Sequence, residues 1–442
     1  MEKISSRKLA EIVESVSLPE ETEISGVSTN SREINPGDAF LALKGEKFDG
    51  HDFAFDAYQN GAALLIVSRK IENVPEDRQV LVADTGRAYG LLGRHNRRQF
   101  KGQVIALTGS AGKTTTKEEL KFVLSQFGRV YATFGNYNNY SGVPRTLLDL
   151  DMNADFAVIE MGMSAKGEIA ELVSYVQPDM AIVTNVYPMH IEFFPDFEAI
   201  AEAKAEIFRG LKKGGTAVIN ADANFADLLE RRAKENGAKV IKFGKGYAAQ
   251  FDFETAQPGE HYQYNAWCVL TVVEALGLDV KRAEAVIPQF GALPGRGKQW
   301  RLREAFGEYT LIDDSYSGQP EAMKIAIQTL SRTEQPGRKI AVLGKMAELG
   351  DTSKARHIEI GQVLAASGID VVVGVCPEMK DALAQLSPDT ERHYFENKDG
   401  LDDFLRNKLL QNNDIVLIKG ARYSSKLYQV AESLINSGAE KQ

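Results

Sequence analysis

Short, continuously apolar runs alternate with stretches of helical periodicity along almost the whole chain, and this alternation limits the fold more than any other feature. Such runs are typical of strands buried on both faces of a parallel sheet. The helical stretches between them supply the crossovers that parallel strands need. The pattern therefore predicts an α/β protein. The predicted strands are 38–45, 62–67, 79–84, 103–109, 156–162, 180–186, 216–221, 239–244, 309–315, 339–344, 370–375 and 414–420.

The predicted strands form three consecutive groups. A chain of 442 residues is too long for a single core, because domains usually hold about 100–200 residues. We therefore expect three α/β domains, covering residues 1–98, 99–293 and 294–442. The last boundary lies at the chain-breaking sequence Pro294-Gly295-Arg296.

The composition excludes several classes of protein. The formal net charge is −9, which argues against a nucleic-acid or anionic-membrane partner. The only cysteines, Cys268 and Cys376, form no CxxC pair, so a reducing compartment fits. The N-terminal stretch is amphipathic rather than a signal peptide, and no apolar run reaches the roughly 18–20 residues of a membrane span. We expect a soluble, cytoplasmic protein.

A glycine-rich turn, Thr-Gly-Ser-Ala-Gly-Lys-Thr-Thr, follows the predicted strand 103–109 and precedes a helix predicted from Lys117. This context is the one that a phosphate-binding loop requires. The strict pattern asks for glycine where the chain has Leu107, so the match is to a shorter variant, and such a turn can also be purely structural. We favour nucleotide binding, with Mg²⁺ held by the threonine after the lysine. The candidate residues are Gly109, Ser110, Ala111, Gly112, Lys113, Thr114 and Thr115.

Three polar residues further along are weaker candidates. Glu160 lies at the end of strand 156–162, where a carboxylate points into the ligand crevice of a parallel sheet; beside a phosphate loop we favour a metal ligand over a solvated residue. His190 follows strand 180–186 and, taken alone, is a loop histidine. Lys204 lies in a helical stretch, where a solvated helix face is the simpler interpretation.

Paired acids, Asp313 and Asp314, lie at the end of strand 309–315. Carboxylates there are suited to bind a ribose, a metal or an amine. A solvated turn explains them equally well, and the residues alone leave the choice open.

Several motifs in a fixed order resemble the Mur ligase family, which forms amide bonds in peptidoglycan precursors. They include TGSAGKTTTKE, GNYNNYSGVPRTLL, LPGRGK, LIDDSY and VLIKGARYSSKL. Together they are far more specific than any one alone. The GNxNN element favours the member that adds D-alanyl-D-alanine to a UDP-muramoyl tripeptide. The resemblance covers residues 28–53, 108–118, 135–148, 160–194, 198–207, 293–298, 311–316, 342–350 and 416–427.

The resemblance implies an N-terminal UDP-substrate domain (1–98), a central P-loop ATPase domain with a mostly parallel sheet (99–293) and a C-terminal Rossmann-like domain for the amine (294–442). It implies the cofactors ATP and Mg²⁺, a UDP-linked muramoyl peptide and D-alanyl-D-alanine as substrates, and we expect a monomer. ATP would phosphorylate the peptide carboxylate, and the amine would attack the acyl phosphate.

The resemblance also implies residue roles. Lys113, His190 and Lys204 would be catalytic, with Thr114 and Glu160 on one Mg²⁺ and His190 on a second. Lys204 matches a carbamylated lysine, which would act as a carboxylate near the second metal. Nucleotide contacts would come from His261, Asn265, Arg296 and Asp314, and substrate contacts from Ser31, Arg32, Asn136, Asn138, Asn139 and Tyr316.

Departures from the family pattern gather at substrate positions. Asn30 stands where the family usually has aspartate, Tyr262 follows His261 in place of asparagine, and Lys345 stands where an acid is common. Ser317-Gly318-Gln319 replaces Asn-Ala-Asn, and Ala421 replaces a serine. A different amine or carboxylate is therefore an alternative. An alternative of another class is a P-loop nucleotide switch without ligase activity.

Overall fold

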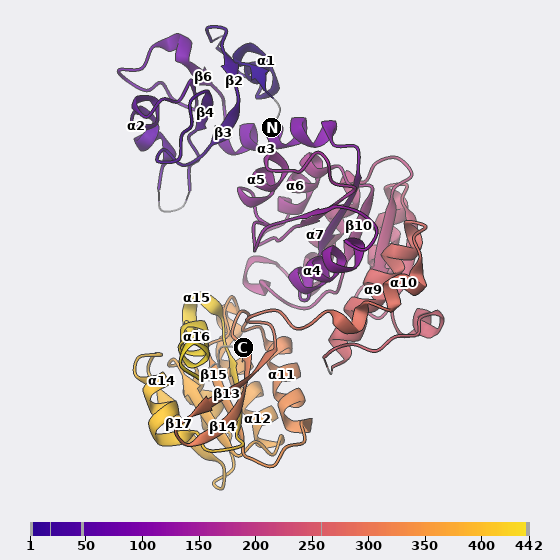
Figure 1. Cartoon of the computed structure of the whole chain (residues 1–442), viewed down its shortest axis with the longest axis vertical. Helices are drawn as coiled ribbons and strands as arrows, with labels where there is room; N and C mark the ends of the chain where they lie inside the picture. Colours follow the sequence, from indigo (N-terminus) through magenta and orange to yellow (C-terminus); the bar gives the residue numbers. More distant parts are fainter. Residues whose placement is uncertain (1–2, 18, 46–47, 258, 439–442) are drawn as a thin grey trace. The chain divides into compact units, whose positions relative to one another are not determined.

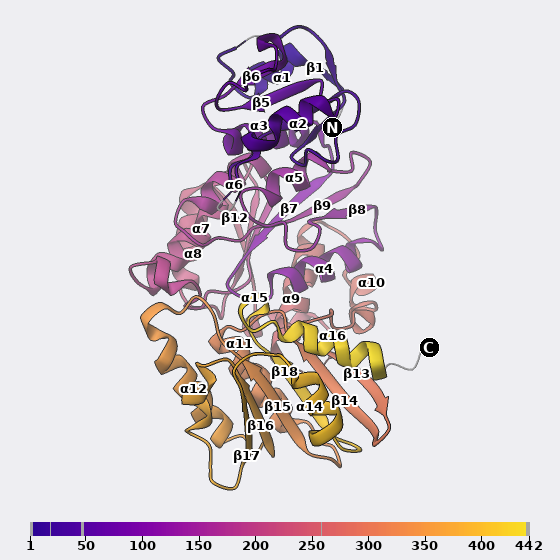
Figure 2. The ribbon, with the colours of Figure 1, turned by 90° about the vertical axis from the view of Figure 1, so that its left-hand side faces the viewer.

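The computed structural model describes residues 3–17, 19–45, 48–257 and 259–438. The chain forms two compact units: one contains the residues up to 186 together with 201–251 and 267–283, and the other contains 187–200, 252–266 and the residues from 284 onward. Figures 1 and 2 show helices packed around separate sheets in indigo, magenta and orange-yellow regions. The predicted α/β class is confirmed. The three domain boundaries stay a prediction.

The N-terminal sheet has four parallel strands in the order β3-β4-β5-β6. Helices α1 and α3 share a core with one face of the sheet, and α2 shares a core with the other. Both faces are covered, which explains why the strands are apolar without alternation. The elements are β3 (Gly26–Ser28), β4 (Asp38–Leu41), β5 (Leu64–Val67), β6 (Gln79–Leu81), α1 (Ser6–Ile12), α2 (Ala54–Gln59) and α3 (Thr85–Gln99). A short antiparallel pair, β1 (Ile4–Ser5) and β2 (Glu23–Ile24), lies apart from this sheet.

Helix α3 connects this sheet to the next one within the first unit. It packs against α5 and α6 as well as on the N-terminal core. Gly90 makes this approach close, because a Cβ there would lie 2.2 Å from the ring of Tyr175. The buried guanidinium of Arg97 donates to the carbonyl oxygens of Val176 and Gln177, at 2.9 and 3.1 Å.

The central sheet is wholly parallel, in the order β12-β11-β10-β7-β9-β8. Its middle strand β7 has β10 on one side and β9 on the other, so the carboxyl ends of three strands meet at one edge. The strands are β7 (Gln103–Thr108), β8 (Val130–Ala132), β9 (Phe156–Glu160), β10 (Met180–Val183), β11 (Thr216–Asn220) and β12 (Lys239–Phe243). The helices are α4 (Lys113–Leu124), α5 (Gly142–Leu148), α6 (Glu168–Val176), α7 (Phe197–Ala205), α8 (Ala226–Glu235), α9 (Glu260–Ala275) and α10 (Val280–Glu284).

The second unit contains a sheet of mixed direction, in the order β13-β14-β18-β15-β16-β17. Strand β13 is antiparallel to β14, and the other pairs are parallel. The edge strands β13 (Lys298–Glu304) and β17 (Glu391–Phe395) were not predicted, because their residues are mostly half-buried or exposed and lack a continuous apolar run. The other strands are β14 (Gly307–Asp314), β15 (Lys339–Gly344), β16 (Val371–Val375) and β18 (Ile415–Lys419).

Helices cover both faces of this sheet. One core joins alternate strand residues to α14 (Leu401–Phe404) and α16 (Leu427–Gly438). The other joins them to α11 (Pro320–Arg332), α12 (Ser353–Ala365) and α13 (Met379–Leu383). This two-sided burial agrees with the predicted Rossmann-like layering.

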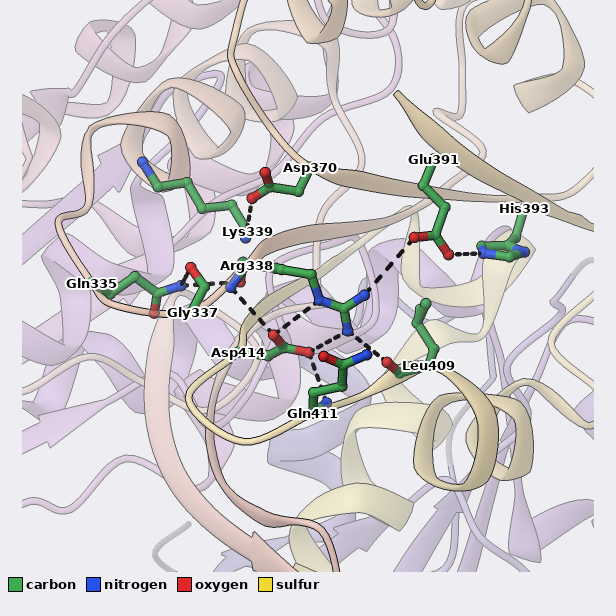
Figure 3. A network of polar contacts seen from close by, with 10 residues as sticks. All are labelled: Gln335, Gly337, Arg338, Lys339, Asp370, Glu391, His393, Leu409, Gln411 and Asp414. Atoms are coloured by element: carbon green, nitrogen blue, oxygen red, sulfur yellow. Dashed lines mark hydrogen bonds and ion pairs between the residues drawn. The ribbon is translucent and has the colours of Figure 1, made fainter. Parts of the chain in front are cut away.

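A polar network lies where β15 and β18 begin (Figure 3). The buried carboxylate of Asp414 accepts from Nε and Nη2 of Arg338, at 3.2 and 2.8 Å, and from the backbone N–H of Gln411 at 2.8 Å. Arg338 also donates to the carbonyl of Leu409. These bonds connect the amino ends of neighbouring strands, at the edge opposite the one where β14 and β18 end.

Among the described residues, no helix is long and apolar enough to cross a membrane.

Candidate active site

The glycine-rich turn bridges β7 and α4. Gly109 has to be glycine, because a Cβ there would lie 1.9 Å from Oγ1 of Thr184. Gly112 has a φ of 77° and directly precedes the helix, a conformation that glycine adopts without strain. Because the chain turns so sharply here, α4 begins at Lys113, and the predicted start at Lys117 is wrong.

Residues after β10 hold this turn in place. The backbone N–H of Ala111 donates to Oδ1 of Asn185 at 2.7 Å, and Nδ2 of Asn185 donates back to the carbonyl of Ala111 at 3.0 Å. The hydroxyl of Thr184 also donates to that carbonyl, at 2.9 Å. These two residues support the loop and were not predicted; their position just beyond a strand beside the loop was the available signal.

The turn has the parts of a phosphate site. Lys113 and Thr114 lie in the first turn of α4, where the backbone N–H groups and the helix dipole favour an anion. Nζ of Lys113 donates to the carbonyl of Gly109 at 2.8 Å, so the ammonium lies over the loop. The predicted set from Gly109 to Thr115 is therefore contiguous and local, as a nucleotide-binding loop requires.

Glu160 and Thr114 are the candidate Mg²⁺ ligands, and the structure brings them together. Glu160 is the last residue of β9, and its Oε1 accepts from the hydroxyl of Thr114 at 3.2 Å and from Nδ2 of Asn138 at 2.8 Å. Its Oε2 is buried and accepts no hydrogen bond from the described residues. A buried, unsatisfied carboxylate oxygen is costly unless a cation or donor serves it. The residues present therefore fit a Mg²⁺ that keeps its remaining ligands as water and phosphate.

Lys117 is a buried cation that sequence reasoning missed. Its side chain is inaccessible to solvent, and its Nζ donates to the carbonyls of Thr133 and Gly135, at 2.7 and 3.0 Å. The same Nζ lies 3.9 Å from Oε2 of Glu160. Lys117 therefore anchors the segment before the GNYNN element and adds positive charge near Glu160.

Lys204 lies near the end of α7 and is only 2% exposed, so the solvated-face interpretation is wrong. Burial, together with the positive charge of Lys113, lowers the pKa of Lys204 well below its usual value. The neighbouring acids do not neutralise it: Glu202 pairs with Arg232, at 2.7 Å, and Glu206 accepts from backbone N–H groups at the start of α6.

His190 lies in a loop, beyond the end of β10 at Val183. It has a φ of 59° and directly precedes a short 3₁₀ helix (Ile191–Phe193), and its Nδ1 lies 2.7 Å from Oε2 of Glu348 in the same unit. Its role as a ligand of a second Mg²⁺ stays a prediction. Among the residues that the structure describes, no group of three or more histidine, cysteine, aspartate or glutamate side chains could hold a metal.

The predicted nucleotide contacts of the second unit form two groups. On α9, His261 is exposed and stacks on Tyr262, with ring centroids 4.2 Å apart, while Asn265 is buried. The hydroxyl of Tyr262 donates to the carbonyl of Arg296 at 3.1 Å. The Arg296 guanidinium lies 4.1 Å from the ring centre of Tyr316.

At the carboxyl edge of the mixed sheet, Asp314 accepts from Nζ of the buried Lys419 at 2.7 Å. Asp313 instead accepts from the backbone N–H of Gly295 and the hydroxyl of Ser315, at 2.8 and 2.6 Å. The two adjacent acids therefore differ in function: Asp313 shapes the backbone, and Asp314 is half of an ion pair.

The predicted substrate residues lie in turns. Ser31 and Arg32 follow β3, where Asn60 donates to the carbonyl of Ser31 and Oδ1 of Asn30 accepts from the N–H of Arg32. Asn136 and Asn139 are exposed, and Asn138 is the one that reaches Glu160. Their contacts with a substrate stay a prediction.

Comparisons with known proteins cover almost the whole chain. The Mur ligase middle domain matches residues 107–266, the Mur ligase glutamate ligase domain matches 300–422, and the Mur ligase family catalytic domain matches 23–94. UDP-N-acetylmuramoyl-tripeptide–D-alanyl-D-alanine ligases from Escherichia coli and Bacillus subtilis are 36% and 35% identical. The alignments cover 94% of this chain and 94% of the Escherichia coli enzyme, and 95% and 94% for Bacillus subtilis.

Solved structures of similar proteins agree with these sequence matches. MurF from Acinetobacter baumannii has a TM-score of 0.88 and 31% identity over 99% of both chains. MurF ligase from Thermotoga maritima, in complex with ADP, has a TM-score of 0.79 and 31% identity over 93% of this chain and 97% of that one. Together with the phosphate loop and its paired Glu160, these likenesses identify the chain as a member of the Mur ligase family of ATP-dependent ligases.

Proposed function

We propose that the protein joins the amine of D-alanyl-D-alanine to the terminal carboxylate of UDP-N-acetylmuramoyl-tripeptide, in the synthesis of peptidoglycan precursors. The observation that carries this proposal is the full-length likeness to ligases named for this reaction, at up to 36% identity. The phosphate loop supports it, because Lys113 lies over the loop and Thr114 lies beside Glu160, the residue types on which phosphoryl transfer relies.

The reaction runs in two steps. A carboxylate oxygen of the peptide attacks the γ-phosphorus of ATP, and the bond to the β-phosphate oxygen breaks to release ADP. The amine nitrogen then attacks the acyl carbon of the acyl phosphate, inorganic phosphate leaves, and the amine proton passes to solvent. Neither step needs a nucleophile from the protein.

The chain's own residues bind and orient these groups. The N–H groups of residues 109–115 receive phosphate oxygens, and the ammonium of Lys113 offsets charge that moves onto the β- and γ-phosphates. Thr114 and Glu160 would hold Mg²⁺, which neutralises phosphate charge when bound. Asn138 keeps the Glu160 carboxylate in place through its 2.8 Å hydrogen bond.

Lys204 would act as a carbamate. Its lowered pKa favours the neutral amine that reacts with carbon dioxide, and the product is an anion suited to a metal. His190 is proposed as a further ligand, and His261, Asn265, Arg296 and Asp314 as nucleotide contacts. ATP and UDP-linked precursors are cytoplasmic metabolites, so the proposal keeps the predicted cytoplasmic location, and a monomer is still expected.

The test supplies purified protein with ATP, Mg²⁺, UDP-muramoyl tripeptides carrying either lysine or diaminopimelate, and a panel of amines. Phosphate release and the mass of the product are measured, with Lys113→Ala as the inactive control. We expect a product of tripeptide plus D-alanyl-D-alanine.

The sequence of the loop after β14 favours a second candidate, a different amine. Ser317-Gly318-Gln319 replaces the family's Asn-Ala-Asn, which removes one amide side chain, at Ser317, and lengthens the other, at Gln319, near the proposed amine site. Product formed only with another amine would replace D-alanyl-D-alanine in the proposal. ATP binding without product from any amine would instead support the nucleotide switch.

A further inference from the structure

We propose that Arg422 binds the terminal carboxylate of the incoming dipeptide and so determines which amines the enzyme accepts. The inference rests on the proposed function, in which the amine is a dipeptide with an amine at one end and a carboxylate at the other. Only the amine reacts, so the carboxylate is the group by which such a substrate can be held without interfering with bond formation.

Arg422 lies at the carboxyl edge of the mixed sheet, where three strand ends come together. Strands β14 and β18 are neighbours and end in register, with Asp314 opposite Lys419. A Cβ on Gly318 would lie 2.2 Å from the backbone nitrogen of Ala421, so the loop after β14 packs directly against the turn after β18. The N–H of Ala421 donates to the carbonyl of Lys345, just beyond β15, at 3.0 Å.

Two aromatic rings hold the side chain of Arg422. Its guanidinium carbon lies 4.2 Å from the ring centre of Tyr428, in the first turn of α16, and 5.4 Å from that of Tyr316. Contacts with ring faces position a guanidinium without using its N–H groups. The side chain is thus ordered in advance, which reduces the entropy lost on binding.

Two lysines of this edge are already paired. Lys419 pairs with Asp314 at 2.7 Å, and Lys345 pairs with Glu378 at 2.5 Å. Arg422, in contrast, has no ion pair and no side-chain hydrogen bond with any residue that the structure describes. Its planar donors are therefore available, and their geometry matches a carboxylate in a bidentate fashion.

The loop that faces this arginine differs from the family pattern. With Ser317-Gly318-Gln319 in place of two asparagines, fewer amide groups are available to bind the dipeptide. A charged contact with Arg422 then makes the larger contribution to recognition. The structure assigns the amine substrates to a class: free amines with a carboxylate at the far end.

The experiment compares D-alanyl-D-alanine with D-alanyl-D-alaninamide, in which a neutral amide replaces the carboxylate and the reacting amine is unchanged. KM and kcat are measured for the wild type, Arg422→Gln and Arg422→Lys. In the wild type, the amide should raise the amine KM about 100-fold, as expected for loss of a charge-assisted, bidentate contact. In Arg422→Gln the KM for D-alanyl-D-alanine should rise by a similar factor. The KM for the amide divided by the KM for D-alanyl-D-alanine should therefore fall close to one.

Arg422→Lys keeps the positive charge but loses the paired N–H donors of the guanidinium, so its ratio of amide KM to D-alanyl-D-alanine KM should be intermediate. The KM for ATP should stay the same in all variants. The matched control is Arg392→Gln on β17, an arginine that donates to the carbonyls of Leu383 and Ser387; it should keep the wild-type ratio. Melting temperatures of all variants show whether each one folds.

Two results would overturn this inference and leave the proposed function standing. One is a wild type that uses D-alanyl-D-alanine and its amide equally well. The other is an Arg422→Gln variant in which the KM values for D-alanyl-D-alanine and for its amide rise by the same factor. A wild type that releases phosphate with neither D-alanyl-D-alanine nor its amide would overturn the proposed function, and this inference with it.

Discussion

Replacing Lys204 by alanine is expected to abolish ligation and to leave ATP binding in place. The side chain is 2% exposed, and burial together with the charge of Lys113 lowers its pKa well below 10.5. An ordinary lysine amine is neutral in only about 0.1% of molecules near pH 7.5, and each unit of pKa lowering raises that fraction about tenfold. Only the neutral amine attacks carbon dioxide, so this environment favours a carbamate over the free ammonium.

The size of the effect follows from the charge. A carbamate replaces a buried cation by an anion that can bind metal, and metal-assisted charge stabilisation is worth several kcal/mol. Losing about 4 kcal/mol slows a reaction about 10³-fold. Lys204→Ala should therefore lower kcat by about 10³-fold or more, while the dissociation constant for ATP changes little, because the loop at residues 109–115 is intact.

Two measurements check this reasoning. Phosphate release gives kcat, and calorimetry with a non-hydrolysable ATP analogue gives nucleotide affinity. Protein equilibrated with ¹³C-bicarbonate should show a carbamate carbon signal in the wild type and not in Lys204→Ala. Lys212→Ala is the control, because Lys212 is half exposed and pairs with Asp179 at 2.7 Å.

The reasoning is refuted if Lys204→Ala keeps wild-type turnover, or if the carbamate signal is missing from active wild-type protein. Loss of nucleotide affinity in Lys204→Ala, together with loss of turnover, would show that the buried lysine supports the fold of the loop instead.

Three further predictions concern metal binding and stability. Glu160→Gln should raise the Mg²⁺ concentration for half-maximal turnover at least about tenfold; an unchanged Mg²⁺ titration contradicts the assignment of its carboxylate. Asp414→Ala should lower the free energy of unfolding by about 3 kcal/mol, because it leaves the half-buried Arg338 unpaired; urea unfolding that matches the wild type would contradict this. The N–H of His51 is the main cause that lowers the pKa of Asp49 from 3.8 to about 2. Its stabilisation is thus complete above pH 4 and lost as the pH falls towards 2. The difference in unfolding free energy between the wild type and Asp49→Asn should shrink over that range, and a difference independent of pH would count against this.

Local patterns in the sequence were sufficient to predict the α/β class and most of the central strands. Continuous apolar runs mark strands buried on both faces, and every strand of the central sheet except the short β8 was predicted within a few residues. The phosphate loop is equally local, since glycines at fixed positions determine its backbone, although the helix begins at Lys113 and not at the predicted Lys117. Such features depend on neighbours in the chain, which is why they can be read without a structure.

The tertiary structure alone decided which distant side chains meet and which are buried. Thr114 and Glu160 are 46 residues apart and bond only because β7 and β9 are adjacent in the sheet. Lys204 looks like a surface lysine by spacing, and its burial depends on the elements that pack over α7. Arg422 became a candidate only when the structure showed two neighbouring lysines paired and its own side-chain donors without a partner in the described part of the chain. Burial and pairing arise from long-range contacts, so no pattern of near neighbours could determine them.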